Sequence, residues 1–114
     1  SWSDKSINQN MELEYIPRAV ELKQDNGYVR DSLGWVYYRL GRYDEARQAL
    51  EEAVRLSKED QTIFEHLGDV YFALGRKEEG LAAYRKALDL LEAGSDAKKN
   101  LAGKVKYLEG QEKK

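Results

Sequence analysis

Apolar residues recur along this chain at the three- and four-residue spacings that place side chains on one face of a helix. The first clear stretch carries four of them: Leu33, Val36, Tyr37 and Leu40. The second stretch carries five: Ala46, Ala49, Leu50, Ala53 and Leu56. Each stretch is therefore predicted to form an amphipathic helix that packs along one face.

Turn residues divide the chain into a series of such helices. The predicted helices cover residues 28–40, 43–57, 61–74, 77–93 and 96–109. Gly41 suits the left-handed residue that ends a helix, and Asp60 is a candidate N-cap for the third helix. Gly94 and Ser95 are expected to end the fourth helix and to cap the fifth.

The pattern occurs twice in the same register. Three pairs of residues are each 34 positions apart: Gly34 with Gly68, Tyr37 with Tyr71, and Gly41 with Gly75. The register continues into the following helix, where Ala53 matches Ala87 and Leu56 matches Leu90. A fixed period of this length is typical of repeat proteins built from stacked supersecondary units.

These residues resemble the tetratricopeptide repeat, a 34-residue unit with a Leu-Gly pair, a Tyr, a turn Gly and two Ala residues. The first copy supplies Leu33, Gly34, Tyr37, Gly41, Ala46, Leu50 and Ala53. The second supplies Leu67, Gly68, Tyr71, Gly75, Tyr84 and Ala87, with Gly80 where the family prefers Ala. The resemblance implies an all-α fold of antiparallel helix-turn-helix repeats, stacked as a short right-handed α-solenoid.

The resemblance also implies a division of the chain within one tetratricopeptide-like domain, 1–114. Its parts are an irregular lead (1–10), a partial repeat helix (11–24), two repeats (27–60 and 61–94), a capping helix (95–109) and a tail (110–114). Ile16 lies 34 residues before Leu50, so the register extends backwards. Pro17 leaves two alternatives for this segment: a helix that starts near it, or one that runs from about residue 9 with a kink.

Gly80 falls inside the predicted fourth helix. A glycine in a helix interior costs about 1 kcal/mol relative to alanine. The change Gly80→Ala is therefore predicted to stabilise the protein, provided that helix packing leaves room for a methyl group.

Composition narrows the range of functions. The chain has 114 residues, of which 41% are apolar and 35% charged, with a formal net charge of −2. An acidic balance argues against a nucleic-acid surface, which is normally strongly basic. The lysines of the last helix, Lys104 among them, are interpreted as a solvated face. No run of residues approaches the length of a membrane-spanning helix.

The sequence carries no recognisable catalytic or cofactor-binding constellation. It has one histidine, His66, and no cysteine, which excludes a disulfide framework and a thiolate metal site. A nucleophile–base relay needs a base held by a third group, and no residues are spaced for one. The prediction is a protein that is not an enzyme and holds no cofactor or metal.

In tetratricopeptide stacks the first helix of each pair lines a concave groove, and the resemblance implies such a groove here. The residues on those helices but off the packing seam are Tyr28, Asp31, Trp35, Tyr38, Thr62, Glu65, Asp69 and Phe72, with Lys99 closing the row. Their character is aromatic and acidic, which favours a partner segment with basic and apolar residues. The alternative is that these aromatic side chains pack against adjacent helices. The lysines and arginines with which some family members clamp a carboxylate are replaced here by residues such as Asp31 and Trp35.

The favoured function is a non-enzymatic interaction module, a scaffold or adaptor that binds a peptide or helix of a partner protein in this groove. The alternative is a structural or self-association segment of a longer solenoid. In that case the apolar residues Met11, Leu13 and Ile16 of the first helix would be covered by a second chain. Neither function involves nucleic acid or insertion into a membrane.

A second, looser resemblance is to the C-terminal repeats of large bacterial tetratricopeptide proteins. It rests on residues 15–22, on the run from Asp25 to Tyr28, and on Asp31 to Tyr38. Members of that group are often exported or associated with the envelope. The resemblance implies a fragment of a longer array, in the cytoplasm or in the bacterial envelope or periplasm.

Overall fold

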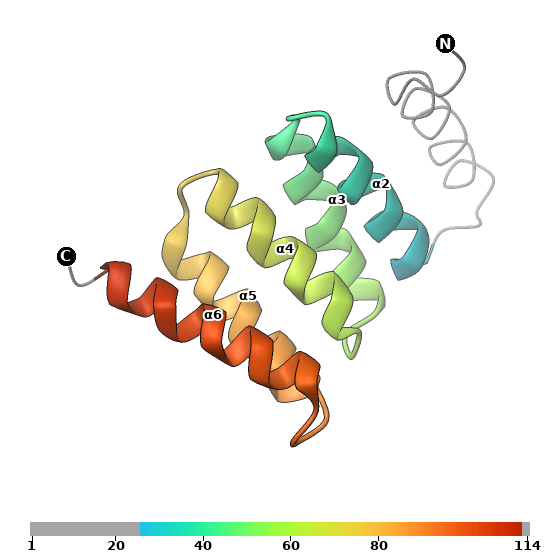
Figure 1. The fold of residues 1–114 in the computed structure, drawn as a ribbon. Helices are drawn as coiled ribbons and strands as arrows, with labels where there is room; N and C mark the ends of the chain where they lie inside the picture. Colours follow the sequence, from blue (N-terminus) through green and yellow to red (C-terminus); the bar gives the residue numbers. More distant parts are fainter. Residues whose placement is uncertain (1–25, 113–114) are drawn as a thin grey trace, which may run out of the picture. The chain divides into compact units, whose positions relative to one another are not determined.

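The computed structural model describes residues 26–112, and their regular structure is helical throughout (Figure 1). The helices are α2 (Gly27–Arg39), α3 (Tyr43–Leu56), α4 (Gln61–Ala73), α5 (Lys77–Leu90) and α6 (Asp96–Glu112). They pack as α2 with α3, α4 with α5, and α5 with α6. The predicted all-α fold of paired helices is thus confirmed. The predicted lead and the helix around Pro17 lie outside the described residues.

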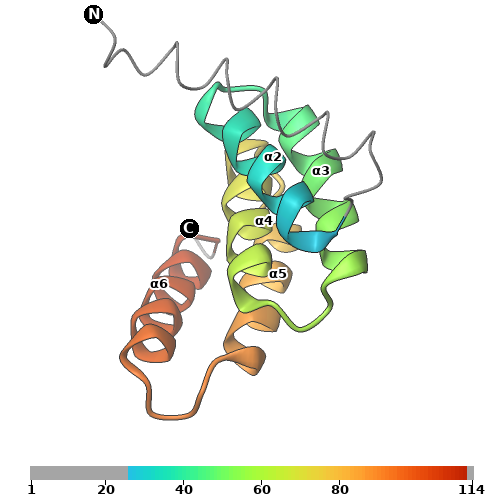
Figure 2. The same ribbon diagram turned by 90° about the vertical axis from the view of Figure 1, so that its right-hand side faces the viewer.

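The chain divides into two compact units, with the boundary between Lys58 and Glu59. The first unit contains the α2–α3 pair, and the second contains α4, α5 and α6. Figure 2 shows the connection after α5 reversing the chain, so that α6 runs back along α5.

Side-chain caps fix where several helices begin. The Asp60 carboxylate accepts a hydrogen bond from the backbone N–H of Thr62 at 2.9 Å, which confirms the predicted N-cap of α4. Asn26 accepts one from the N–H of Val29 at 2.8 Å at the start of α2. The Ser95 hydroxyl accepts one from the N–H of Lys98 at 3.2 Å, as predicted for the cap of the last helix.

Each helix pair turns through a glycine with a positive φ. Gly41 has φ 78° and Gly75 has φ 77°. The Arg42 N–H donates to the Tyr37 carbonyl at 2.9 Å, while the Gly41 N–H donates to the Tyr38 carbonyl at 3.0 Å. These two bonds form a Schellman motif, which satisfies carbonyls at the end of α2. The prediction that Gly41 ends this helix is confirmed.

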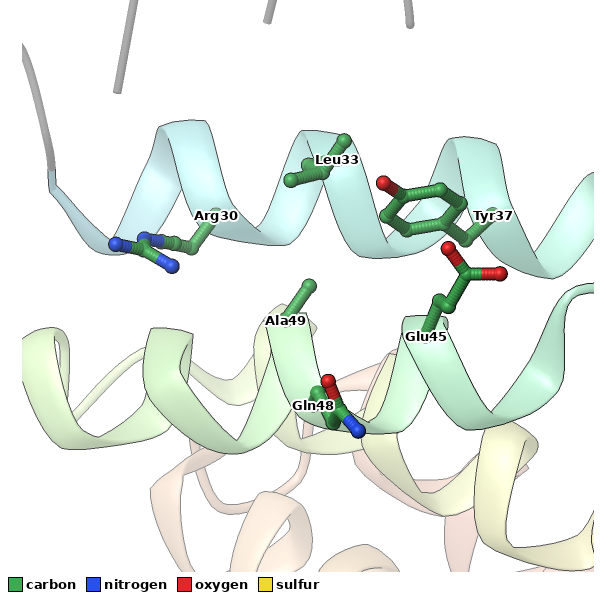
Figure 3. A pocket seen from close by; sticks show the side chains of 6 residues that line it. All are labelled: Arg30, Leu33, Tyr37, Glu45, Gln48 and Ala49. Carbon is green, nitrogen blue, oxygen red and sulfur yellow. The ribbon is translucent and has the colours of Figure 1, made fainter. Parts of the chain in front are cut away.

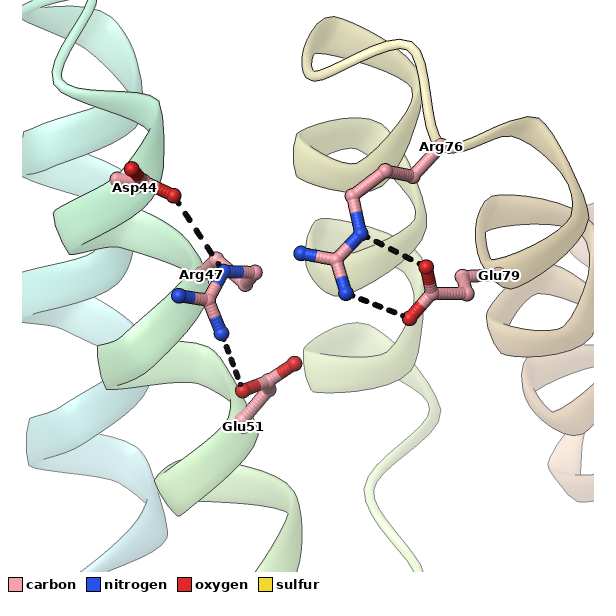
Figure 4. Close-up of polar contacts among 5 residues, drawn as sticks. All are labelled: Asp44, Arg47, Glu51, Arg76 and Glu79. Carbon is pink, nitrogen blue, oxygen red and sulfur yellow. Dashed lines mark hydrogen bonds and ion pairs between the residues drawn. The ribbon is translucent and has the colours of Figure 1, made fainter.

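A bidentate arginine–glutamate ion pair follows each of these turns. Arg42 donates two hydrogen bonds to Glu45, at 2.8 and 2.6 Å, and its guanidinium lies 4.7 Å from the Tyr37 ring centroid. Arg76 and Glu79 repeat the arrangement at 2.7 and 2.8 Å (Figure 4). The ion pair therefore repeats with the 34-residue period, and it links the turn to the first turn of the helix that follows.

Close helix packing in the first unit depends on small residues. Ala46, Leu50 and Ala53 on α3 are fully buried. A Cβ added at Gly34 would lie 2.6 Å from Leu50 Cγ, so α2 approaches α3 more closely than any side chain at this position would allow. The same added Cβ would lie 3.3 Å from the Ala46 carbonyl oxygen, so the small residues lie where the two helices meet.

The second unit has a core to which all three of its helices contribute. The buried cluster consists of Leu81, Tyr84, Ala87, Leu101 and Val105. Partly buried apolar side chains surround it: Phe64, Phe72, Leu88, Leu91 and Leu108. Leu101 and Val105 come from α6, so the last helix covers apolar surface of α5, as the predicted capping helix should.

The condition set for a stabilising Gly80→Ala, room for a methyl group, is not met in the structure. A Cβ at this position would lie 2.5 Å from Cδ2 of Phe72 and 2.6 Å from its Cε2. It would also lie 3.3 Å from the Gly68 carbonyl oxygen. The ring of Phe72 occupies the space that a side chain at Gly80 would need.

Two predicted helix ends differ from the structure. α5 ends at Leu90, three residues before the predicted end, because Leu91 adopts an extended conformation with ψ 145°. α6 continues to Glu112, beyond the predicted end at residue 109, so Gly110 belongs to the helix and not to a tail. The assignment of the whole chain to one domain stays a prediction.

Candidate partner-binding surface

Three aromatic rings form a continuous strip on the first unit. Trp35 and Tyr38 of α2 stack with ring centroids 4.8 Å apart and planes 16° from parallel. Tyr38 lies 5.6 Å from Tyr43, the first residue of α3, in a tilted arrangement. Trp35 and Tyr38 are half-buried, and Tyr43 is 37% exposed. We call Trp35, Tyr38 and Tyr43 the aromatic strip.

The other two predicted groove residues of the first unit differ in their surroundings. Tyr28 is 74% exposed at the start of α2. Asp31 is buried, with only 9% of its surface accessible. Tyr28 therefore has the accessibility that partner binding requires, whereas Asp31 presents little surface.

Asp69 of the second unit lies in a polar cluster that links three helices. The Tyr84 hydroxyl of α5 donates a short hydrogen bond to Asp69 Oδ1. The ammonium of Lys104 on α6 lies 3.3 Å from the same oxygen and 4.7 Å from the Tyr84 ring centroid. We call Asp69, Tyr84 and Lys104 the Asp69 cluster. Lys104 is exposed, as interpreted from the sequence, and it also contacts side chains of two neighbouring helices.

The remaining predicted residues of the second unit fall into two groups. Phe72 is half-buried and stacks on Tyr84, with centroids 5.5 Å apart, so its ring is part of the packing in this unit. Glu65 is half-buried, whereas Thr62 and Lys99 are exposed. A groove lined jointly by the residues of both units stays a prediction.

A hollow of about 220 Å³ lies on the first unit between α2 and α3. Arg30, Leu33 and Tyr37 line it from α2, while Glu45, Gln48 and Ala49 line it from α3 (Figure 3). Leu33 and Ala49 make its middle apolar. The charged groups of Arg30 and Glu45 lie toward its two ends. The hollow thus has an apolar floor of limited area between groups of opposite charge.

The ion pair between Arg42 and Glu45 shifts the pKa values of both groups. The hydrogen bond with Glu45 raises the pKa of the Arg42 guanidinium, and the same bond lowers the pKa of the Glu45 carboxyl. On the same helix, Arg47 Nη1 donates to Glu51 at 2.8 Å (Figure 4). The buried Nε of Arg47 lies 3.5 Å from an Asp44 oxygen without a hydrogen-bond partner. These pairs keep the charged side chains of α3 engaged with one another.

Within residues 26–112, no group of three or more histidine, cysteine, aspartate or glutamate side chains has a geometry suited to a metal ion. In the same range, no helix has both the length and the apolar character needed to cross a membrane. The chemistry of the described surface is therefore that of aromatic and charged side chains.

Comparison with known proteins agrees with this architecture. A family model described as "Tetratricopeptide repeat" matches residues 32–97, more than half of the chain. The chain belongs to the tetratricopeptide-repeat family. Such domains generally act as protein–protein interaction modules and are typically not enzymes. Among curated proteins, none matches this sequence.

Two solved structures have a similar tetratricopeptide arrangement: one described as "MamA AMB-1 P212121", and one of a MamA mutant. The first is 27% identical, with a TM-score of 0.71, and the match covers 82% of this chain and 51% of that one. The mutant is 24% identical, with a TM-score of 0.64, and the match covers 82% and 78% of the two chains. This tetratricopeptide chain therefore spans about half the length of the first structure.

Reasoning from the sequence did not predict the contacts that three residues make in these surfaces: Tyr43, Tyr84 and Lys104. Tyr43 follows directly after the Gly41-Arg42 turn, and this position was the available signal that it would lie near the end of α2. Tyr84 was assigned only to the packing seam, although a buried tyrosine hydroxyl needs a polar partner. Lys104 gave no local signal, because its partner Asp69 is 35 residues away.

Proposed function

We propose that this tetratricopeptide chain is a scaffold or adaptor that binds a peptide or helix of a partner protein. The binding surface is the set of aromatic and acidic side chains on the first helix of each pair, which would line the concave groove predicted from the sequence. The partner segment carries apolar residues that pack on the rings and basic residues that pair with the carboxylates.

The observation that carries this proposal is the aromatic strip. Stacking of Trp35 on Tyr38 leaves both rings half-buried, and Tyr43 extends the row onto α3. Large rings held in fixed positions offer contact area at low entropic cost, and tryptophan and tyrosine dominate the energetics of many interfaces. The repeat does not require this arrangement, since the residue 34 positions after Trp35 is Asp69.

A paired capture experiment tests the proposal. One bait is the wild-type chain, and the other carries Trp35→Ala and Tyr38→Ala. Phe72 is left unchanged, because its ring packs on Tyr84 and its loss would disturb the second unit. After chemical crosslinking, we expect proteins that are captured by the wild-type bait to be absent from the variant bait. Binding of an identified partner segment is then measured by calorimetry.

Tyr107→Ala is the matched control. Tyr107 is 65% exposed on α6, so its loss removes a surface ring without touching the aromatic strip. Capture that survives in this control and is lost with the Trp35 and Tyr38 changes supports the proposal. Equal capture by all three folded baits would contradict it.

A second candidate function, a segment within a longer array, is favoured by the hollow between α2 and α3. Leu33 and Tyr37 on its wall precede Leu101 and Val105 by 68 residues, which is two repeat periods. In the second unit those two equivalents are buried with residues of α5, the preceding second helix. The hollow therefore has the position in which a preceding second helix would pack: the helix predicted for residues 11–24, or one from an array or a second copy.

A further inference from the structure

The last helix, α6, stands in the register of a first helix. Leu101 follows Leu67 by 34 residues, and Val105 follows Tyr71 by the same interval. Leu101 and Val105 are buried with Leu81, Tyr84 and Ala87 of α5. The α4–α5 pair thus presents a surface that takes an amphipathic helix, and α6 shows what kind of helix fits it.

The fit of α6 has an apolar and a basic component. Leu101, Val105 and Leu108 supply the apolar contacts at spacings of four and three residues. Lys104 supplies the basic one, through its ion pair with Asp69 and its contact with the Tyr84 ring. The residues one and two repeat periods earlier are Val70 and Val36, both buried. A lysine at this position is therefore specific to α6.

Outside these contacts, Glu109 of α6 forms an ion pair with Arg85 of α5, and two glycines lower the helix propensity of α6. These are Gly103 and Gly110, and glycine is a poorer helix former than alanine. A Cβ added at either position would meet nothing within 4 Å, so packing does not require glycine there. The segment before α6 includes Gly94 with φ 81°, a turn residue between the two helices. The docked state of α6 is thus weakened by residues that the fold does not need.

We propose that the α4–α5 pair is a binding site for a helix of a partner protein. In the free chain α6 occupies this site, and the partner helix competes with α6 for it. The partner is an amphipathic helix of another protein with apolar residues at its first, fifth and eighth positions and a lysine at its fourth. This inference rests on the proposed function and names its ligand on the second unit. A partner reaches Asp69 and Phe72 when α6 leaves them.

A labelled synthetic peptide of residues 96–112 is the probe, and its binding to the whole chain is measured by fluorescence anisotropy. The chain that carries Gly103→Ala and Gly110→Ala holds its own α6 more firmly, because both changes favour the docked helix. We expect this variant to bind the unaltered peptide about tenfold or more weakly, since the competent state is less populated. Unchanged affinity, or no binding by either chain, overturns the proposal.

A charge exchange tests whether the peptide takes the place of α6. The second peptide carries Lys104→Glu, and we expect wild-type chain to bind it about fivefold more weakly than the first. In the Asp69→Lys chain the preference should reverse. Asp69→Asn keeps an acceptor for the Tyr84 hydroxyl, and this chain should bind both peptides alike. It replaces the Asp69→Lys chain in the test if that chain does not fold. Discrimination that is the same in every folded chain overturns the proposal.

Sedimentation velocity of the wild-type chain separates a partner helix from a second copy. Dimers that disappear in the Gly103→Ala, Gly110→Ala variant would mean that α6 exchanges between copies, and this outcome overturns the assignment to a partner protein. The two peptide experiments can fail while the capture of partner proteins is still lost on removal of the Trp35 and Tyr38 rings. That combination would leave the proposed function in place and would overturn only the role of α6.

Discussion

Two glycines on neighbouring helices of the second unit differ in what surrounds them, and this difference predicts opposite effects of the same substitution. We expect Gly80→Ala to lower the free energy of unfolding by about 1 kcal/mol, because the clash with Phe72 outweighs the gain in helix propensity. We expect Gly103→Ala to raise it by up to about 1 kcal/mol, since its Cβ would enter open space. Urea denaturation of both variants gives the comparison. A stabilised Gly80→Ala would show that the Phe72 ring moves aside at little cost.

Glu45 provides a prediction that depends on pH. Its pKa is lowered in the folded state by the hydrogen bond from Arg42. The pair therefore stabilises the fold above the unfolded-state pKa of Glu45, and this contribution is lost as the pH falls through the lower folded-state pKa. Carbon-detected NMR titration should show the Glu45 midpoint rising toward its ordinary value in Arg42→Gln. Arg55→Gln is the control, because Arg55 pairs with Glu52, and it should leave the Glu45 midpoint unchanged.

Single residues also show where reasoning from the sequence ends. The sequence alone suggests that Gly80 is a defect in a helix and Phe72 an exposed anchor, yet they are one feature, because the ring fills the space beside the glycine. The sequence indicates that Lys104 is one of several lysines on a solvated face, and its side chain is 51% exposed. Its partners Asp69 and Tyr84 come from two other helices. Spacing along one helix predicts which face is apolar, but it does not predict which side chains of other helices will meet it.

Whole elements were predictable to a greater extent. The 34-residue period placed the helix pairs, because the glycines and alanines that repeat are those at which helices approach or turn. Gly34 meets Leu50, and Gly68 meets Tyr84 in the same way. The ends of α5 and α6 were less predictable, since they depend on the conformation of Leu91 and on Gly110 remaining helical.

The turn between α2 and α3 gives a prediction at the scale of the element. A Cβ at Gly41 would meet nothing within 4 Å, so Gly41→Ala costs only backbone strain at φ 78°. We expect a loss of about 1 kcal/mol in the free energy of unfolding. Gly41→Asn should lose less, because asparagine tolerates the left-handed region better. Thermal unfolding followed by circular dichroism measures both, and equal stability of Gly41→Ala and wild type would mean that the turn rearranges.

For the whole molecule, the open question is whether the chain acts by binding other proteins or by extending an array of copies. The aromatic strip favours the first function, and the hollow beside Leu33 favours the second. The two differ in what they require of the free chain. An interaction module needs no second copy, whereas an array segment should associate through the hollow.

We expect the chain to be a monomer of 13.1 kDa in sedimentation velocity at micromolar concentrations. Arg30 and Glu45 place charges toward the two ends of the hollow and leave only a small apolar floor, whereas a specific, stable interface buries roughly 1,200–2,000 Å² of surface. Leu33→Glu would place a charge on its apolar floor and should leave the sedimentation coefficient unchanged. Should the wild type instead form dimers that this change dissociates, the hollow is a contact between copies, and the array segment becomes the better account. Dimers unaffected by Leu33→Glu but lost with Gly103→Ala and Gly110→Ala would assign the contact to α6.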